Sequence, residues 1–70
     1  MVSYTAQNIK RIIADKGLKQ IYIAEKAGYD RQVFNNMLNG RKIITDADIP
    51  RIANALGVEP NDLFELPKYD

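Results

Sequence analysis

Side chains of the kind that pair with nucleic-acid bases are concentrated in a short stretch near the middle of the chain. Four of them lie close together: Arg31, Gln32, Asn35 and Asn36. A guanidinium pairs with O6 and N7 of guanine, and a carboxamide pairs with N6 and N7 of adenine. Exposed helix faces without a binding role usually favour Glu and Lys for their helix propensity. The amide-rich composition therefore favours base recognition over an ordinary solvated surface.

Residues suited to catalysis or metal binding are scarce. The sequence contains no His and no Cys, so it lacks the commonest general base, the usual zinc ligands and any disulfide. The hydroxyl groups of Ser3, Thr5 and Thr45 have no histidine to activate them. We therefore expect no enzyme activity, no metal site and no cofactor.

Length and charge limit the organisation of the chain. Its 70 residues suffice for a single domain, expected over residues 1–70 with a core at about 5–66. Residues 1–44 carry eight basic and three acidic side chains, a net charge of +5, whereas residues 45–70 carry two basic and six acidic ones, a net charge of −4. A polyanion could bind the basic part, although solubility explains such charge equally well.

The apolar stretches are far shorter than the ~20 residues that span a bilayer, so we expect a cytoplasmic protein without a membrane partner.

The spacing of apolar residues and the positions of Gly and Pro predict an all-α protein with five short helices. The expected helices cover residues 5–16, 20–27, 31–38, 48–56 and 60–66. The residues expected to cap them are Ser3 or Thr5 for the first, Asp30 for the third, and Thr45 or Asp48 for the fourth. In the fifth, Leu63 and Phe64 are expected to pack inward.

The second and third helices have the pattern of a helix-turn-helix. Two short helices that cross steeply need a small residue at their approach, a glycine in the turn and hydrophobic residues that lock the angle. Ala24 and Gly28 meet the first two needs, and the hydrophobic set is Ile23, Ala27, Tyr29, Phe34 and Met37. The chain resembles the lambda-repressor-like DNA-binding domains, the family of phage repressors, Cro and regulators of the xenobiotic-response-element type. The resemblance covers about residues 9–64, including segments 18–20, 39–41 and 52–58, and implies a compact five-helix bundle.

Two departures from the family pattern are informative. Relatives often have a glutamate just before the Asn39-Gly40 pair, bonded to an arginine of the first helix, whereas this chain has Leu38 and Ile13 at the matching positions. Because replacing a buried ion pair by packed aliphatic side chains is often neutral or stabilising, we expect Ile13 to contact Leu38. Lys19 stands where relatives commonly have a Ser or Thr cap, so we expect the second helix to fray at its start.

The resemblance also implies contacts to DNA, because in this family the third helix enters the major groove while the second lies across the backbone. The residues expected to contact bases are Arg31, Gln32, Val33, Asn35 and Asn36. For Val33, a contact with a thymine methyl group and a place covering the turn stand as equal alternatives. The residues expected to contact phosphates are Lys19, Gln20, Asn39, Arg41 and Lys42, and the alternative for Gln20 is that it only opens its helix.

These features together predict a sequence-specific regulator that binds double-stranded DNA, a repressor of phage, mobile-element or antitoxin-like type, acting on the nucleoid of a bacterium. By resemblance it acts as a homodimer, at least on DNA, and reads a palindromic operator. The candidates for the dimer surface are the fourth and fifth helices with the nearby Ile43, Ile44, Leu66 and Tyr69, and the alternative is that these residues only extend the small core. The alternative is a protein-interaction module or antitoxin of the same fold whose main partner is another protein. The acidic second half of the chain favours this alternative modestly. Ile21 and Tyr22, at positions that are usually polar in relatives, are expected to form a weak partner patch.

Overall fold

Residues 3–65 are described by the computed structural model, and they form four α-helices and one short 3₁₀ helix. The elements are α1 (Tyr4–Asp15), α2 (Gln20–Ala27), α3 (Arg31–Leu38), α4 (Asp48–Leu56) and η1 (Pro60–Phe64). No strand occurs among these residues, which confirms the all-α prediction. The expected limits of the first helix are displaced by one residue at each end.

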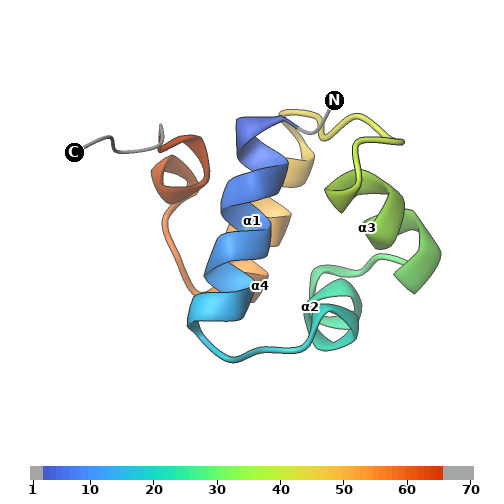
Figure 1. The fold of residues 1–70 in the computed structure, drawn as a ribbon, viewed down its shortest axis with the longest axis horizontal. Coiled ribbons are helices and arrows are strands. Elements are labelled where there is room, and N and C mark those ends of the chain that lie inside the picture. Colours follow the sequence, from blue (N-terminus) through green and yellow to red (C-terminus); the bar gives the residue numbers. More distant parts are fainter. Residues whose placement is uncertain (1–2, 66–70) are drawn as a thin grey trace.

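The helices enclose one hydrophobic core. The helix α1 packs against η1 on one side and α3 on the other, and α4 packs against α2 and η1, so that α2 and α3 project together from one side of the molecule (Figure 1). The large side chains that are almost fully buried are Ile9, Ile23, Phe34, Met37, Leu38, Ile52 and Leu63. Ile13 and Leu38 both belong to this core, as their apolar character requires, while their direct contact stays a prediction.

The helix caps agree with the sequence at three of the four helices. The Ser3 hydroxyl accepts a hydrogen bond from the Ala6 N–H at 3.1 Å, and the Asp30 carboxylate accepts one from the Gln32 N–H at 2.8 Å. Lys19 precedes α2 without a side-chain cap, as expected. The prediction for α4 is wrong, because Ala47 is the N-cap and no side chain caps this helix.

The fifth element differs from the predicted α-helix. Residues 60–64 form a 3₁₀ helix, the form expected of a short segment that Pro60 opens. Leu63 is buried, but Phe64 is 52% exposed and does not pack inward as predicted. With only three residues per turn, neighbouring side chains point in different directions, and Leu63 alone faces the core.

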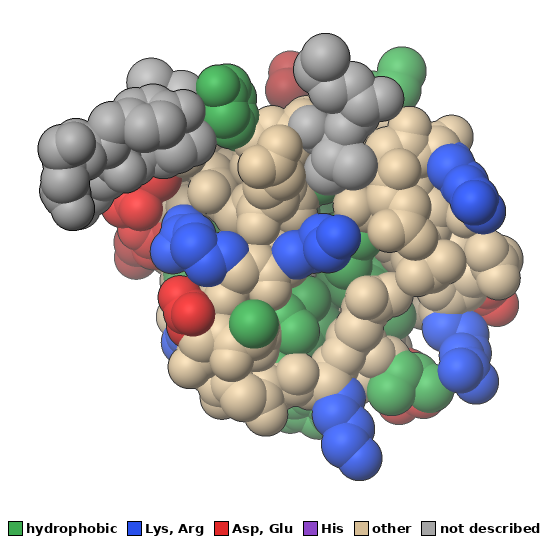
Figure 2. All heavy atoms as spheres, viewed as in Figure 1, with side chains coloured by type: hydrophobic (Ala, Val, Ile, Leu, Met, Phe, Trp, Pro, Cys, Tyr) green, Lys and Arg blue, Asp and Glu red, His purple; other side chains and the backbone are tan. Residues whose placement is uncertain are grey.

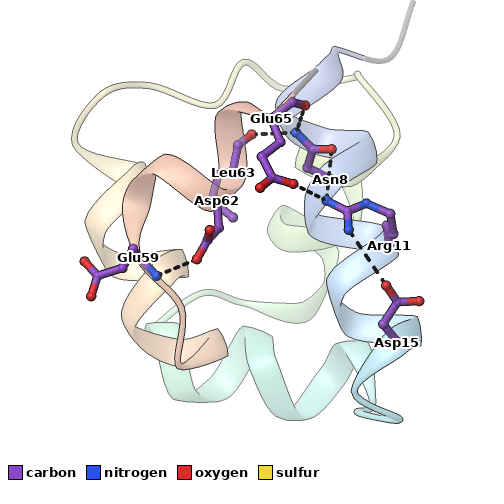
Figure 3. A network of polar contacts seen from close by, with 7 residues as sticks. All are labelled: Asn8, Arg11, Asp15, Glu59, Asp62, Leu63 and Glu65. Atoms are coloured by element: carbon purple, nitrogen blue, oxygen red, sulfur yellow. Dashed lines mark hydrogen bonds and ion pairs between the residues drawn. The ribbon is translucent and has the colours of Figure 1, made fainter. Parts of the chain in front are cut away.

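A buried amide attaches this segment to α1. The Asn8 side chain donates hydrogen bonds to the carbonyl oxygens of Leu63 at 2.9 Å and Glu65 at 2.7 Å. Arg11 lies between Asp15 and Glu65, with N···O distances of 3.8 Å to both (Figure 3). The Asn8 side chain is buried, and its hydrogen bonds to the two carbonyl groups offset the free energy that burying an unpaired amide would cost.

Candidate nucleic-acid interface

The turn between α2 and α3 needs a glycine for two reasons. Gly28 has a φ of +87°, in the left-handed region that favours glycine. A Cβ built on it would lie 3.0 Å from Nη2 of Arg51. The N–H of Tyr29 then donates to the carbonyl of Ala24 at 2.8 Å, closing the end of α2. This geometry directs the chain from α2 into α3.

Arg51 of α4 clamps this turn from the opposite side. Its Nε and Nη2 atoms donate to the carbonyl of Ala27 at 3.2 and 3.0 Å, and Nη2 also donates to that of Gly28 at 3.2 Å. The guanidinium carbon lies 4.2 Å from the centre of the Tyr29 ring, a cation–π contact. The carbonyl groups left free at the end of α2 are thus bound by a cation, which also suits the helix dipole.

Tyr29 connects Arg51 to Asp48 and, through it, to Thr45 in the loop after α3, and these four residues are together called the clamp. Its hydroxyl donates to Oδ1 of Asp48 at 2.7 Å, while Oδ2 of Asp48 accepts from the N–H and hydroxyl of Thr45 at 2.8 and 2.9 Å. Burial and the bond to Asp48 raise the pKa of Tyr29 to about 12. Burial by itself would raise the pKa of Asp48, but the bonds from Thr45 and Tyr29, with the charge of Arg51, bring it below 3.8. The sequence reasoning missed this network, because its members are far apart in the chain.

The predicted base-contacting residues lie on the outward side of α3. Arg31 and Gln32 are exposed, and Asn35 and Asn36 are half-buried. Val33 is half-buried and packs against the core, and its contact with a thymine methyl group stays a prediction. The polar side chains are therefore presented on a helix that Phe34, Met37 and Leu38 anchor from below.

Two hydrogen bonds between carboxamides order this face. Nε2 of Gln20 donates to Oδ1 of Asn35 at 3.2 Å, which joins the start of α2 to α3. Nε2 of Gln32 donates to Oδ1 of Asn36 at 3.1 Å, one turn further along α3. A carboxamide has two N–H groups and one oxygen, so Gln32 keeps an oxygen and an N–H for another partner. This is the pair of groups that adenine takes in the major groove.

A hollow of about 290 Å³ lies where α2 meets this face. The residues that line it are Gln20, Ile21, Ala24, Arg31, Gln32 and Asn35. It brings Gln20, predicted for a phosphate, beside three of the residues predicted for bases. Ile21, which is 39% exposed, also lines it and was not predicted there.

The residues predicted for phosphates border the same side of the molecule. Lys19, Asn39, Arg41 and Lys42 are exposed, and Gln20 is half-buried. The N–H groups of Arg41 and Lys42 both donate to the carbonyl of Asn36, at 2.9 and 3.2 Å, so the basic loop is tied to α3. In Figure 2, Lys and Arg side chains project from the α2–α3 side, at the right and bottom, and two more lie at the left and centre, where α1 lies. Acidic side chains appear at the left, near α1 and η1, and also at the right and top.

Other kinds of site find little support in residues 3–65. No group of three or more His, Cys, Asp or Glu side chains there is arranged to hold a metal ion. Within the same range, none of the helices has both the length and the apolar character needed to cross a membrane.

A helix-turn-helix whose second helix presents guanidinium and amide groups between basic flanks defines a DNA-binding domain. The chain belongs to the family of Cro/C1-type HTH DNA-binding domains, which it matches over residues 8–68. The resemblance predicted from the sequence is thereby confirmed. Comparison with curated protein sequences found no match.

Two solved structures are similar to this one. The restriction-modification controller protein C.AhdI from Aeromonas hydrophila is 30% identical, with a TM-score of 0.80 over 87% of this chain and 92% of that chain. The clp gene regulator ClgR from C. glutamicum is 21% identical, with a TM-score of 0.82 over 87% of this chain and 79% of that chain, and shows the fold alone. The family match and C.AhdI support a DNA-binding transcriptional regulator.

Proposed function

We propose that this protein is a sequence-specific transcriptional regulator of repressor type that reads the major groove of duplex DNA with α3. The observation that carries the proposal is the exposed polar face of α3, where Arg31 and Gln32 stand free of the core and carboxamide hydrogen bonds hold the side chains in place. Arg31 pairs with guanine, and Gln32 and Asn36 pair with adenine. Such a regulator acts in the cytoplasm, on the nucleoid.

The flanking groups hold α3 in the groove. Lys19 and Gln20 at the start of α2 contact one stretch of phosphates, and Asn39, Arg41 and Lys42 after α3 contact another. The N–H groups at the start of α2 have no side-chain cap, which leaves them free to bind a phosphate. These contacts fix the register of the helix without reading sequence.

The protein acts as a homodimer on a palindromic operator with half-sites about 34 Å apart. Support comes from the small number of base contacts that one eight-residue α3 can make. Ile43, which is 82% exposed in the loop before α4, is available for a dimer surface, whereas Ile44 is half-buried against the core. The other two candidates, Leu66 and Tyr69, lie outside the described residues.

The regulatory role has support in the neighbours' names. C.AhdI is called a controller protein, and it covers most of this chain at 30% identity. The control of restriction-modification that this name states is compatible with the expected phage, mobile-element or antitoxin-like type.

A protein partner is the second candidate function. Ile21 and Tyr22 expose 39% and 50% of their surface on α2, where an apolar surface serves a protein contact better than a phosphate contact. In that case the fold is that of an interaction module or antitoxin, and duplex DNA is not its main ligand.

Selection from a pool of random duplexes separates the two functions. The regulator enriches one motif with two-fold symmetry, and the purified motif binds in a gel-shift titration. The double variant Arg31→Ala/Gln32→Ala, which alters only exposed side chains, should enrich no motif. Recovery of an unenriched pool by the unaltered protein contradicts sequence-specific regulation and favours the interaction module.

A further inference from the structure

The turn that ends α3 contains an asparagine followed by a glycine. Asn39 is the C-cap of α3, with φ −97° and ψ 6°, and Gly40 follows with φ +79°. Both residues are exposed. Asn39 is also the only asparagine in the sequence that precedes a glycine. Its side-chain amide therefore has an unhindered backbone nitrogen next to it, because Gly40 has no Cβ to obstruct an approach.

The backbone nitrogen of Gly40 is the least firmly held in this turn. Its N–H lies 3.5 Å from the carbonyl of Met37, at the outer limit of a hydrogen bond. By contrast, the N–H groups of Asn39 and Arg41 donate at 3.0 and 2.9 Å. A small local opening after the last turn of α3 therefore frees the Gly40 nitrogen without unfolding the helix.

We propose that Asn39 is a self-modification site, at which deamidation replaces a neutral amide by a carboxylate and weakens the binding of DNA. The Gly40 nitrogen attacks Cγ of Asn39, and a new N–Cγ bond forms. The Cγ–Nδ2 bond breaks, and the amide nitrogen leaves as ammonia with the proton lost from Gly40. Water then opens the cyclic imide at either of its two carbonyl carbons, giving aspartate or isoaspartate, with no change of oxidation state.

The other asparagines are less suited to this reaction. Asn35, Asn36 and Asn54 each precede a residue inside an α-helix, and Asn61 precedes Asp62 inside η1. Their following nitrogens belong to residues with a Cβ, held in helical geometry. Asn8 precedes Ile9 within α1, and its amide is engaged with two carbonyl groups. The reaction should therefore be confined to Asn39.

The product places a negative charge at position 39, where the proposed function requires a group that binds a phosphate. A carboxylate at the C-terminal end of α3 is disfavoured by the helix dipole and repels a phosphate. Isoaspartate also adds one methylene to the backbone, directly before Arg41 and Lys42. The N–H groups of these two residues bind the carbonyl of Asn36, so the insertion displaces the basic loop from its place beside α3. This consequence rests on the proposed function, whereas the chemical step does not.

Incubation of the purified full chain without DNA tests the chemical step. Peptide mapping by mass spectrometry should find aspartate and isoaspartate at position 39, and their amount should rise faster in mildly alkaline than in neutral buffer. Asn39→Gln is the matched control, because glutamine keeps the amide but would have to close a larger ring. The chemical step is wrong if position 39 stays unmodified under conditions that modify any other asparagine, or if it reacts no faster than the glutamine variant.

Binding to duplex DNA tests the consequence. Modified protein, separated from unmodified protein by ion exchange, should bind duplex DNA about two- to fivefold more weakly, the size expected of one exposed charge near a phosphate. Asn39→Asp should show the part of this loss that is due to charge. Asn54→Asp adds the same charge at an exposed position of α4 and should bind like the unmodified chain. Equal affinity of modified and unmodified protein would overturn the consequence. If unmodified protein binds no duplex, the proposed function fails, and peptide mapping still decides whether Asn39 is modified.

Discussion

At the scale of single residues, the α3 carboxamides that we propose as base readers keep hydrogen-bonding groups that the fold leaves unpaired. One N–H of Gln32 is taken by Asn36 at 3.1 Å, and one lone pair of Asn35 is taken by Gln20 at 3.2 Å. Each amide is thereby oriented before DNA arrives, so less side-chain entropy is lost on binding.

Replacement of Gln32 by Ala should relax the choice of base at one operator position. The expected loss is about 1–3 kcal/mol of discrimination between the selected base pair and its substitutes, because the paired groups of Gln32 are removed. Titrations against a set of single-base operator variants measure this quantity. Asn54→Ala, an exposed site on α4, is the control and should leave the base preferences unchanged. Unaltered preferences in the Gln32 variant would remove Gln32 from the set of base readers.

A charge that contacts phosphate should act differently from one that reads a base. Lys42→Ala should weaken binding to all duplexes by a similar factor and lower the slope of log affinity against log salt concentration by about 0.9. Lys16, whose ammonium lies near Gly57 at the end of α4, supplies the matched control. If the slopes for the Lys42 and Lys16 variants are the same, Lys42 does not contact a phosphate.

At the scale of elements, α4 determines how the helix-turn-helix is held. Arg51 donates to the Ala27 carbonyl at the end of α2, and Asp48 accepts a hydrogen bond from the hydroxyl of Tyr29, the residue after Gly28. The ring of Tyr29 lies 5.9 Å from that of Phe34, nearly parallel to it, so the clamp continues into α3. The angle between α2 and α3 therefore depends on contacts from a third helix, α4.

The clamp should make stability depend on pH in the acid range. The pKa of Asp48 in the fold lies below its ordinary 3.8, so its stabilising effect is present above that value and is lost as the pH falls through the folded pKa. Urea denaturation at several pH values should show the unaltered chain more stable than Asp48→Asn near neutrality, with the difference shrinking below pH 3.8. A constant difference down to the lowest pH would mean that the Asp48 carboxylate is not stabilised by its partners.

The packing of α1 on α3 can be tested by restoring the charge pair that relatives often have. Leu38 is 1% exposed, so Leu38→Glu alone should cost about 3–5 kcal/mol by burying an unpaired charge. Adding Ile13→Arg should recover a large part of this loss if the two positions touch. Thermal unfolding of the single and double variants gives the coupling between them. Additive losses would show that Ile13 and Leu38 are not in contact.

Local patterns in the sequence predicted most of this architecture. The four α-helices follow from apolar spacing, glycine stops and the Ser3 and Asp30 caps, all of which act within a few residues. The 3₁₀ form of residues 60–64, the exposure of Phe64 and the lack of a side-chain cap on α4 depend on packing that the local pattern does not contain. The Arg51 clamp was missed for the same reason, because it joins residues more than twenty positions apart.

At the scale of the whole molecule, the charge separation seen in the sequence matches the placement of the elements. Five of the eight basic residues of the first half lie on α2 and α3 or next to them, whereas Lys10, Arg11 and Lys16 belong to α1 or its end. Among the acidic residues of the second half, Glu59, Asp62 and Glu65 lie on η1 or beside it. A polyanion is therefore attracted to the side of the molecule that carries the polar face of α3, and this attraction orients the first encounter.

The most direct test of major-groove reading by α3 is the affinity for a selected operator in which single guanines are replaced by 7-deazaguanine. This analogue keeps Watson–Crick pairing and removes the N7 acceptor from the major groove. The account predicts that one replacement per half-site weakens binding by roughly tenfold, the loss of about 1.5 kcal/mol expected for a hydrogen bond to a charged donor. The same replacement should have no effect on the Arg31→Ala variant. Unchanged affinity of the unaltered protein at every guanine of the operator would contradict the account.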